Sequence, residues 1–334
     1  MTFLKDILKD IGNEHATLAA DISEDERFVD TGSFIFNALV SGSINGGISS
    51  NKITAIAGES STGKTFFALA VVRSFLDSDP NAIAVYFDTE SAITRSLLED
   101  RGIDTSRVIV INVVTIEEFR TKALQCVDKY LKVSESDRQP MMFVLDSLGM
   151  LSTEKEIGDA LAEKNVRDMT KSQLVKGAFR MLTLKLGQAD VPLIVTNHTY
   201  DVIGSYVPTK EMGGGSGLKY AASTIIYLSK KKEKDGKEVI GNIIKAKTAK
   251  SRLSKENQEV EIRLYYDERG LDRYYGLLEL GELGGLWKNI AGRYEIDGKK
   301  LYAKEILKNP EKYFTEEVML KLDVIAQGTF SYGS

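Results

Sequence analysis

The segment GESSTGKT matches the phosphate-binding pattern G-x-x-x-x-G-K-[ST]. An apolar run precedes it and an amphipathic run follows at once, so a strand leads into this loop and a helix leaves it. Glycines let the backbone amides turn toward phosphate oxygens, and the amino end of the helix adds partial positive charge. Lys64 would reach the β- and γ-phosphates, and the Thr65 hydroxyl would bind Mg²⁺. We predict a nucleoside triphosphate site formed by Gly58, Glu59, Ser60, Ser61, Thr62, Gly63, Lys64 and Thr65.

A magnesium ion that accompanies a triphosphate needs a carboxylate close by. The run PMMFVLDSLG places Asp146 at the carboxyl end of an apolar stretch, where open α/β sheets bind ligands. Taken alone, Asp146 would be read as a helix cap. Beside a phosphate loop, we predict that Asp146 and Thr65 hold the metal.

Hydrolysis also requires a group that orients or deprotonates water. The run VYFDTESAIT places Asp88 and Glu90 after another apolar stretch, with Glu90 beyond the expected strand. Glu90 is therefore the candidate general base, and an ordinary exposed acid is the alternative.

The elements that must position these residues alternate from about Thr31 onward. Short apolar runs predict strands at 52–58, 83–88, 107–112, 141–147, 192–198 and 223–229. Amphipathic runs predict helices at 64–76, 91–102, 115–133 and 171–189. This alternation indicates an α/β fold with a mostly parallel sheet and helices on both faces. A lysine-rich hairpin tip near Asp235 and Gly236, and strands at 242–249 and 259–267, would continue the sheet.

The bulk composition limits the classes of protein. The chain has 334 residues, of which 43% are hydrophobic and 28% charged, and this suits a globular protein. A net charge of −4 excludes a globally basic nucleic-acid binder, so affinity for a phosphate backbone must come from local patches or repeated subunits. One cysteine suits a reducing cytoplasm. No run approaches the roughly 20 apolar residues of a membrane span, and we expect no membrane partner.

The chain divides into three expected parts. Residues 1–30 would form a small N-terminal oligomerisation arm, 31–275 the ATPase core, and 276–334 a small C-terminal domain. Apolar side chains in the first part recur at helical spacing but are too few to fold alone. That helix packs either on its own domain or on a neighbouring subunit. The side chains concerned are Phe3, Leu4, Ile7, Leu8 and Ile11.

A glycine-rich stretch after His198 carries the most specific sequence signal. A loop of this length inside a compact domain usually has a function. Here the chain resembles the RecA-type strand-exchange proteins, and in particular the phage UvsX recombinases. The resemblance covers nearly the whole chain and implies a RecA-like P-loop ATPase core. It rests on DSLGMLSTEKEIGDALAEKNVRDMTKSQLVKGAFR, NHTY, MGGGSGLKYAAS and KSR.

The resemblance implies roles for four residues outside the phosphate loop. Glu90 matches the glutamate that activates water, and His198 stands where the family has a polar sensor of the γ-phosphate. Lys250 and Arg252 match cations that reach the ATP of a neighbouring subunit and stabilise charge on its γ-phosphate. Without the family, His198 would be read as structural and the two cations as solvated surface charges.

The family binds DNA through two loops, which the resemblance places at about 152–165 and 199–217. Bound ATP would order the second loop through His198, and hydrolysis would release it. Glycines would let backbone amides approach DNA phosphates closely; a passive connector is the alternative. The expected DNA-binding residues are Lys155, Lys164, Arg167, Tyr200, Lys210, Gly213, Gly214, Gly215 and Lys219.

The resemblance therefore implies an ATP- and Mg²⁺-dependent DNA recombinase. It would form helical filaments on single-stranded DNA, pair them with double-stranded DNA and exchange strands, with DNA-stimulated ATP hydrolysis. Loading and single-strand-binding proteins would be further partners, in the cytoplasm of a host if the chain is viral. A hexameric helicase motor and a non-hydrolysing regulatory filament protein are the alternatives. Leu97 departs from the family, because cellular relatives place an adenine-stacking tyrosine there, and Arg95 is the nearest substitute.

Overall fold

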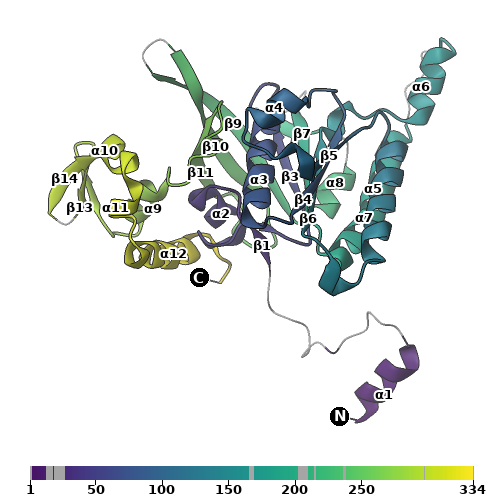
Figure 1. Ribbon diagram of the computed structural model, residues 1–334, viewed down its shortest axis with the longest axis horizontal. Coiled ribbons are helices and arrows are strands. Elements are labelled where there is room, and N and C mark those ends of the chain that lie inside the picture. Colours follow the sequence, from purple (N-terminus) through teal and green to yellow (C-terminus); the bar gives the residue numbers. More distant parts are fainter. Residues whose placement is uncertain are drawn as a thin grey trace.

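A nine-stranded sheet forms the centre of the molecule (Figure 1). Its strand order is β11-β10-β9-β3-β7-β6-β4-β5, and β8 pairs with β7. The strands are β3 (Ile53–Gly58), β4 (Ile83–Asp88), β5 (Val108–Asn112), β6 (Met141–Asp146), β7 (Leu193–Asp201), β8 (Lys210–Met212), β9 (Thr224–Asp235), β10 (Glu238–Lys250) and β11 (Glu259–Tyr265). This computed structural model describes residues 2–12, 18, 27–164, 169–201, 210–213, 216–235, 238–296 and 298–333.

The parallel register brings distant parts of the sequence to one edge of the sheet. Gly58 of β3 stands opposite His198 of β7, and Asp88 of β4 stands opposite Asp146 of β6. The strands from β9 to β5 run parallel, whereas β10 and β11 extend the β9 edge in antiparallel orientation. The predicted mostly parallel sheet is confirmed, and its carboxyl edge gathers the candidate site residues.

Helices cover both faces of the sheet, as predicted (Figure 1). On one face, α2 and α3 join an apolar cluster in which the rings of Phe36 and Phe67 lie 4.8 Å apart. On the other face, α5, α7 and α8 enclose a second cluster, in which Phe87 and Phe119 lie 5.1 Å apart. The helices of this part are α2 (Phe34–Ser41), α3 (Lys64–Ser78), α4 (Arg95–Glu99), α5 (Ile116–Leu131), α6 (Glu154–Leu161), α7 (Lys171–Ala189) and α8 (Ser216–Ala221).

The helix predicted at 91–102 is shorter than expected, because α4 begins only at Arg95. The Asp88 carboxylate accepts hydrogen bonds from the backbone N–H groups of Glu90 (3.0 Å) and Ile93 (2.9 Å). These bonds fix a turn ahead of the helix, and Thr94 then caps its first turn. A short polar side chain that bonds nearby amides competes locally with helix formation.

The predicted end of the fifth strand is also wrong. β7 continues beyond His198 to Asp201, because Thr199 pairs with Met212 and Asp201 with Lys210 in an antiparallel ladder with β8. The expected second DNA loop therefore starts as a hairpin. Residues 202–209 and 214–215, with the predicted Gly214 and Gly215, lie outside the described residues.

The first expected DNA loop, 152–165, contains the helix α6. Thr153 begins this helix through a capping box, in which its side chain accepts from the Glu156 N–H and the Glu156 carboxylate accepts from the Thr153 N–H. Figure 1 shows α6 projecting from the same side of the molecule as α4. Arg167, predicted to bind DNA, lies outside the described residues.

Helix α1 (Thr2–Ile11) confirms the helical spacing at the N-terminus, and Figure 1 shows it set apart from the sheet. Its apolar side chains Phe3 and Leu4 are 74% and 57% exposed. Two short strands, β1 (Phe28–Val29) and β2 (Ile48–Ser49), pair beside the core. None of the helices in the described ranges is long and apolar enough to cross a bilayer.

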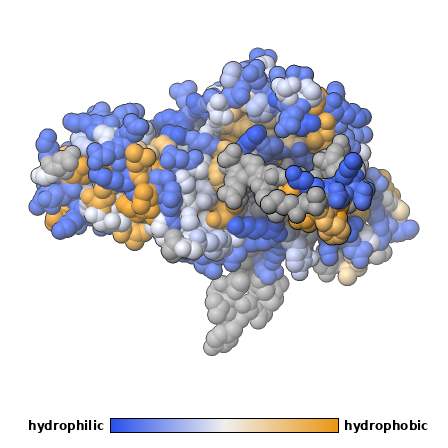
Figure 2. Space-filling model, turned by 90° about the horizontal axis from the view of Figure 1, so that it is seen from below, coloured by the Kyte–Doolittle hydropathy of each residue, from blue (hydrophilic) through white to orange (hydrophobic). Residues whose placement is uncertain are grey.

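The C-terminal residues form a three-stranded sheet, three helices of four to seven residues and the 15-residue helix α12. The apolar cluster of α2 and α3 continues into this unit through Trp287, Phe314 and Leu322. Figure 2 shows apolar groups on the surface of this unit, at the left of the view, and the exposed side chains include Leu320 and Val324. Its elements are α9 (Leu277–Leu283), β12 (Lys288–Ile290), β13 (Arg293–Ile296), β14 (Lys299–Tyr302), α10 (Ala303–Lys308), α11 (Pro310–Tyr313) and α12 (Glu316–Phe330).

Candidate nucleotide-binding site

The phosphate loop connects β3 to α3, as the sequence predicts. A Cβ atom on Gly58 would lie 2.8 Å from the Leu228 carbonyl oxygen, so only glycine fits between β3 and β9. Gly63, with φ of 92°, adopts the left-handed conformation that starts the helix. Thr62 is buried and donates its hydroxyl to the Glu59 carbonyl (2.9 Å), which stabilises the loop from within.

Lys64 is buried inside this loop, with 6% of its surface exposed. Its Nζ donates to the carbonyl oxygens of Gly58 (3.1 Å) and Glu59 (2.8 Å), and lies 3.4 Å from His198 Nδ1. Burial lowers the pKa of Lys64 below its ordinary value of 10.5, against the opposing charges of Asp146 and Glu90. A buried ammonium bonded to loop carbonyls is placed to exchange them for phosphate oxygens.

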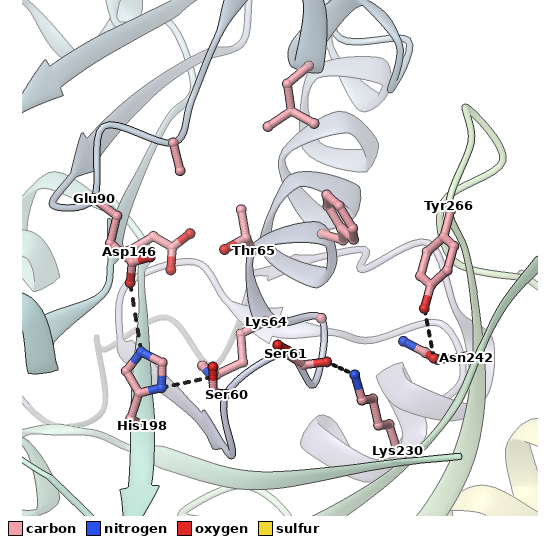
Figure 3. A pocket seen from close by; sticks show the side chains of 14 residues that line it. Ser60, Ser61, Lys64, Thr65, Glu90, Asp146, His198, Lys230, Asn242 and Tyr266 are labelled. Atoms are coloured by element: carbon pink, nitrogen blue, oxygen red, sulfur yellow. Dashed lines mark hydrogen bonds and ion pairs between the residues drawn. The ribbon is translucent and has the colours of Figure 1, made fainter. Parts of the chain in front are cut away.

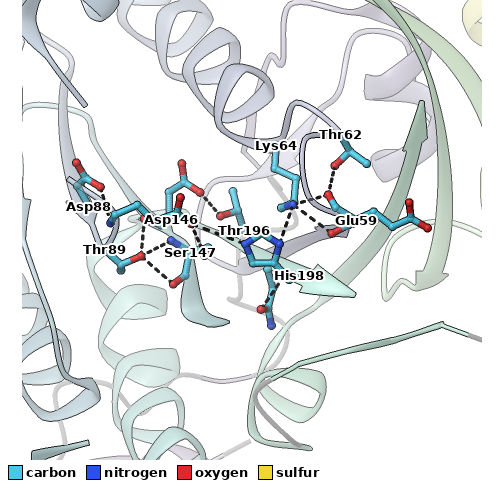
Figure 4. Close-up of polar contacts among 12 residues, drawn as sticks. Glu59, Thr62, Lys64, Asp88, Thr89, Asp146, Ser147, Thr196 and His198 are labelled. Carbon is cyan, nitrogen blue, oxygen red and sulfur yellow. Dashed lines mark hydrogen bonds and ion pairs between the residues drawn. The ribbon is translucent and has the colours of Figure 1, made fainter. Parts of the chain in front are cut away.

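Two hydroxyl groups hold Asp146 at the end of β6, and Figure 4 shows the contact with Thr196. Tyr86 donates to one carboxylate oxygen at 2.7 Å, and Thr196 donates to the other. Burial, with the nearby Asp146 charge, raises the pKa of Tyr86 well above 10.0, so this hydroxyl remains a donor. Each carboxylate oxygen has a further lone pair, so Asp146 can still accept a bond from a metal-bound water.

The side chains present fit a magnesium ion that arrives with its triphosphate. Thr65 and Asp146 line the same cavity and offer only oxygen ligands, which Mg²⁺ prefers. Across the described residues, no group of three or more His, Cys, Asp and Glu side chains could hold a metal alone. This agrees with a site where substrate phosphates and waters complete the coordination.

Glu90 and His198 face one another on the same side of the cavity (Figure 3). His198 Nε2 lies 3.7 Å from the Glu90 carboxylate, and the Ser147 hydroxyl donates to the same oxygen at 3.3 Å. The Glu90 side chain is 43% exposed, so water can reach it. His198 thus lies between an acid and Lys64, with one ring nitrogen toward each.

Asp88 and Thr89 hold Glu90 in this position, a role that sequence reasoning did not assign. Asp88 forms the bonds to the turn that are described above. The Thr89 hydroxyl accepts from the Ser147 N–H (2.8 Å), and the Thr89 backbone N–H donates to the Asp146 carbonyl (2.9 Å). These contacts tie the end of β4 to the end of β6 (Figure 4). The sequence shows β4 and β6 as two apolar runs, but it does not show that they are neighbours in the sheet. The role of Asp88 and Thr89 could therefore not be predicted without the strand order.

A continuous set of hydrogen bonds leads from His198 into the β7–β8 hairpin. The fully buried Asn197 donates its amide to the Gly213 carbonyl (2.8 Å) and accepts from the His198 N–H (2.8 Å). Gly213 donates its own N–H to the His198 carbonyl at 3.0 Å. A Cβ on Gly213 would lie 2.8 Å from the Tyr200 ring, so a larger residue here would have to displace that exposed ring. These bonds join the backbone of His198 to the start of the glycine-rich segment.

The other expected DNA-binding residues lie on or near these segments. Lys155 and Lys164 are exposed at α6, and Tyr200 is 59% exposed on the hairpin. Lys219, on α8, forms an ion pair with Glu211 at 3.5 Å. The backbone of Lys210 forms the first residue of β8.

Lys250 and Arg252 do not line the cavity. The Lys250 ammonium instead donates to the carbonyls of Lys219 and Ala222, both at 2.7 Å, and Tyr220, at 3.3 Å, and so caps the end of α8. Burial lowers the pKa of Lys250. Arg252 is exposed, two residues after the end of β10.

The cavity has a volume of about 610 Å³. Besides the predicted residues, it is bounded by Phe66, Tyr266 and Asn242 (Figure 3). The Tyr266 hydroxyl donates to Asn242 at 2.9 Å, and Leu97 also lines the cavity. Aromatic surface is therefore available for a nucleobase from Phe66 and Tyr266, even though Leu97 offers none. Arg95 is absent from the residues that line the cavity, so the described residues give it no stacking role.

A parallel sheet with a phosphate loop at its carboxyl edge places this chain in the class of P-loop α/β proteins. Within that class, residues 2–272 match the RecA N-terminal domain family, and the chain belongs to the RecA family.

Several curated proteins are similar to this chain. It is 35% identical over 261 residues to the recombination and repair protein of Enterobacteria phage T4, covering 78% of this chain and 65% of that protein. It is 28% identical over 289 residues to protein RecA of Corynebacterium urealyticum, covering 84% and 74% of the two chains. Protein RecA of Bifidobacterium longum is 26% identical over 303 residues, with 90% and 72% covered. The chain thus matches just under two thirds of the length of the phage relative.

Proposed function

We propose that this chain is an ATP- and Mg²⁺-dependent DNA recombinase. It assembles on single-stranded DNA into a helical filament, pairs that strand with homologous double-stranded DNA, and exchanges strands. The observation that carries the proposal is the set of contacts from Lys64 through His198 and Asn197 to Gly213. Such contacts let the terminal phosphate of ATP set the conformation of a DNA-binding segment. Family membership and similarity to a recombination and repair protein support the same assignment.

In the proposed hydrolysis, each side chain has one task. The phosphate loop and Lys64 bind the triphosphate, and Glu90 orients or deprotonates the attacking water. His198 senses the γ-phosphate from between Lys64 and Glu90. Thr65 and Asp146 hold Mg²⁺, which neutralises phosphate charge when it is bound.

DNA would bind along α6 and the β7–β8 hairpin. The few cations there suit many weak contacts repeated along a filament rather than tight binding by one subunit. The proposed contacts are Lys155, Lys164, Tyr200, Lys210, Gly213 and Lys219, together with Arg167, Gly214 and Gly215 outside the described residues.

Assembly would use the three parts of the chain differently. We assign 1–30 as an arm that packs on a neighbour, 31–275 as the ATPase core, and 276–334 as a small C-terminal domain. The exposed apolar face of α1, including Phe3 and Leu4, supports packing in trans. Lys250 and Arg252 would approach the ATP of the next subunit. Loading and single-strand-binding proteins would assist in the cytoplasm, of the host if the chain is viral.

The test is ATP turnover with and without single-stranded DNA, followed by electron microscopy with a slowly hydrolysed ATP analogue. We expect DNA to stimulate turnover and to produce open helical filaments. A rate that ignores DNA would contradict the proposal. Closed rings that unwind duplexes would favour a helicase, and DNA binding without turnover would favour a regulatory filament protein.

A further inference from the structure

Three antiparallel strands form one wall of the nucleotide cavity. Alternate residues of a strand face the same side. On β9, Ile226 and Leu228 are buried in the cluster beneath α3, and Lys230 is the next residue in that row. Lys230 therefore lines the cavity, together with Asn242 of β10 and Tyr266, which follows β11. The wall changes from apolar to polar where it passes the phosphate loop.

Lys230 contacts the phosphate loop directly. Its ammonium donates to the carbonyl oxygen of Ser61, whose φ of 58° lies in the left-handed region. Figure 3 shows Lys230 approaching Ser61 from the side opposite to His198. Lys64 binds the carbonyls of Gly58 and Glu59, so two lysines from different elements hold the same loop.

The charge of Lys230 is available to an anion. The side chain is exposed, and among the residues whose side chains the structure describes, no carboxylate forms an ion pair with it. An ammonium has three donors, and Ser61 takes one of them. Burial chiefly lowers the pKa of Lys64, and the nearby positive charge of Lys230 adds to that lowering.

We propose that Lys230 is a second phosphate-binding cation of this site, acting at the β,γ end of the triphosphate from the wall opposite His198. This rests on the proposed function, in which the cavity binds a nucleoside triphosphate. Lys64 contributes from inside the loop, and Lys230 contributes from β9 while holding Ser61 in its left-handed conformation. Because β9 runs on into the hairpin with β10, the same lysine links that hairpin to the occupied site.

The matched pair of variants is Lys230→Met and Lys231→Met. Lys231 is the neighbouring exposed residue on β9 and, by strand alternation, faces the other side. ATP, ADP and AMP binding would be measured by titration calorimetry without DNA, at low salt, with thermal melting of each variant. We expect Lys230→Met to weaken ATP binding about tenfold, since a charge-assisted bond is lost. AMP binding should stay unchanged, Lys231→Met should match the unmodified chain, and Lys230→Arg should retain most of the affinity.

Lys64→Ala, measured in parallel, distinguishes a failure of the proposed nucleotide site from a failure of the proposed role of Lys230. If Lys64→Ala leaves ATP binding intact, the proposed nucleotide site itself is wrong. If Lys64→Ala abolishes binding while Lys230→Met behaves like Lys231→Met, only the role of Lys230 is overturned. An equal loss for ATP and AMP in Lys230→Met would also overturn it, because AMP lacks the phosphates that Lys230 is proposed to bind.

Discussion

The side-chain amide of Asn197 donates a 2.8 Å hydrogen bond to the backbone carbonyl of Gly213. Asn197 is completely buried and also accepts the N–H of His198. One side chain thus joins His198, which lies beside Lys64, to the glycine-rich segment. We expect movement of the histidine and movement of this segment to be coupled, because partly buried hydrogen bonds are costly to leave unmade.

His198→Ala should separate nucleotide binding from the response to DNA. The imidazole lies beside Lys64 and Glu90, but the loop carbonyls position Lys64 without it. ATP binding should therefore remain nearly intact while DNA stimulation of turnover falls. Asn197→Ala should produce the same loss and lower the free energy of unfolding by about 1–3 kcal/mol, because the Gly213 carbonyl loses its buried donor. Calorimetry, denaturant unfolding and turnover assays measure these effects, and full DNA stimulation in both variants would refute the coupling.

Glu90→Gln should remove hydrolysis and retain ATP binding. The amide keeps the size of the carboxylate but cannot accept a proton, so kcat should fall about 10²- to 10⁴-fold. Glu99→Gln is the matched control, since Glu99 lies on α4 in an exposed pair with Arg95 and does not line the cavity. Turnover measured with saturating ATP and DNA tests this. Unchanged turnover in Glu90→Gln would mean that Glu90 is an ordinary exposed acid without a role in hydrolysis.

The sheet and the phosphate loop could be predicted because each depends on local sequence. Buried parallel strands are continuous apolar runs, and the loop needs glycines at fixed spacing. The carboxyl-edge rule predicted that Asp146 lies near the loop, and this rule needs only strand direction, which follows from the alternation with helices. Glu90 was expected from its position just beyond a strand, whereas the place of His198 came from the family resemblance.

The remaining parts depend on contacts between distant residues. The short α4 results from Asp88 binding two amides, and the length of β7 results from pairing with β8. Lys230 follows the apolar Ile226 and Leu228 in its row on β9, and in sequence it merges with the lysine run of the hairpin. Its place at Ser61 becomes visible only when β9 is known to pair with β3.

ATP binding should weaken at alkaline pH because of Lys64. Burial lowers its pKa below 10.5, and the ammonium must be protonated to attract phosphate. The affinity for ATP is therefore highest at pH values below the lowered pKa of Lys64, and it declines as the pH rises through that pKa. Bound phosphate favours the charged form, so ATP binding should take up protons in this range.

Titration calorimetry in two buffers of different ionisation enthalpy, at several alkaline pH values, measures this uptake. Lys64→Arg is the control, because a guanidinium stays protonated throughout that range. Equal proton uptake by Lys64→Arg and the unmodified chain would assign the linkage to another group.

Substitution of Lys250 should lower the stability of the fold, whereas substitution of Arg252 should lower DNA-stimulated turnover. Lys250 caps α8 with three carbonyl contacts, so Lys250→Met should lower the free energy of unfolding by about 1–3 kcal/mol. Arg252 is exposed, so Arg252→Ala should leave stability unchanged but reduce DNA-stimulated turnover, by about 10³-fold if it acts as an arginine finger. Denaturant unfolding and turnover assays separate the two effects.

Mixing two inactive variants tests whether Arg252 acts on the neighbouring subunit. Arg252→Ala keeps its own phosphate loop, and Lys64→Ala keeps its own arginine. In a mixed filament, the arginine of a Lys64→Ala subunit would meet the intact ATP site of an Arg252→Ala subunit. Turnover should therefore recover on mixing, with a maximum at intermediate ratios. Mixtures no more active than the separate variants would place Arg252 outside the neighbour's site.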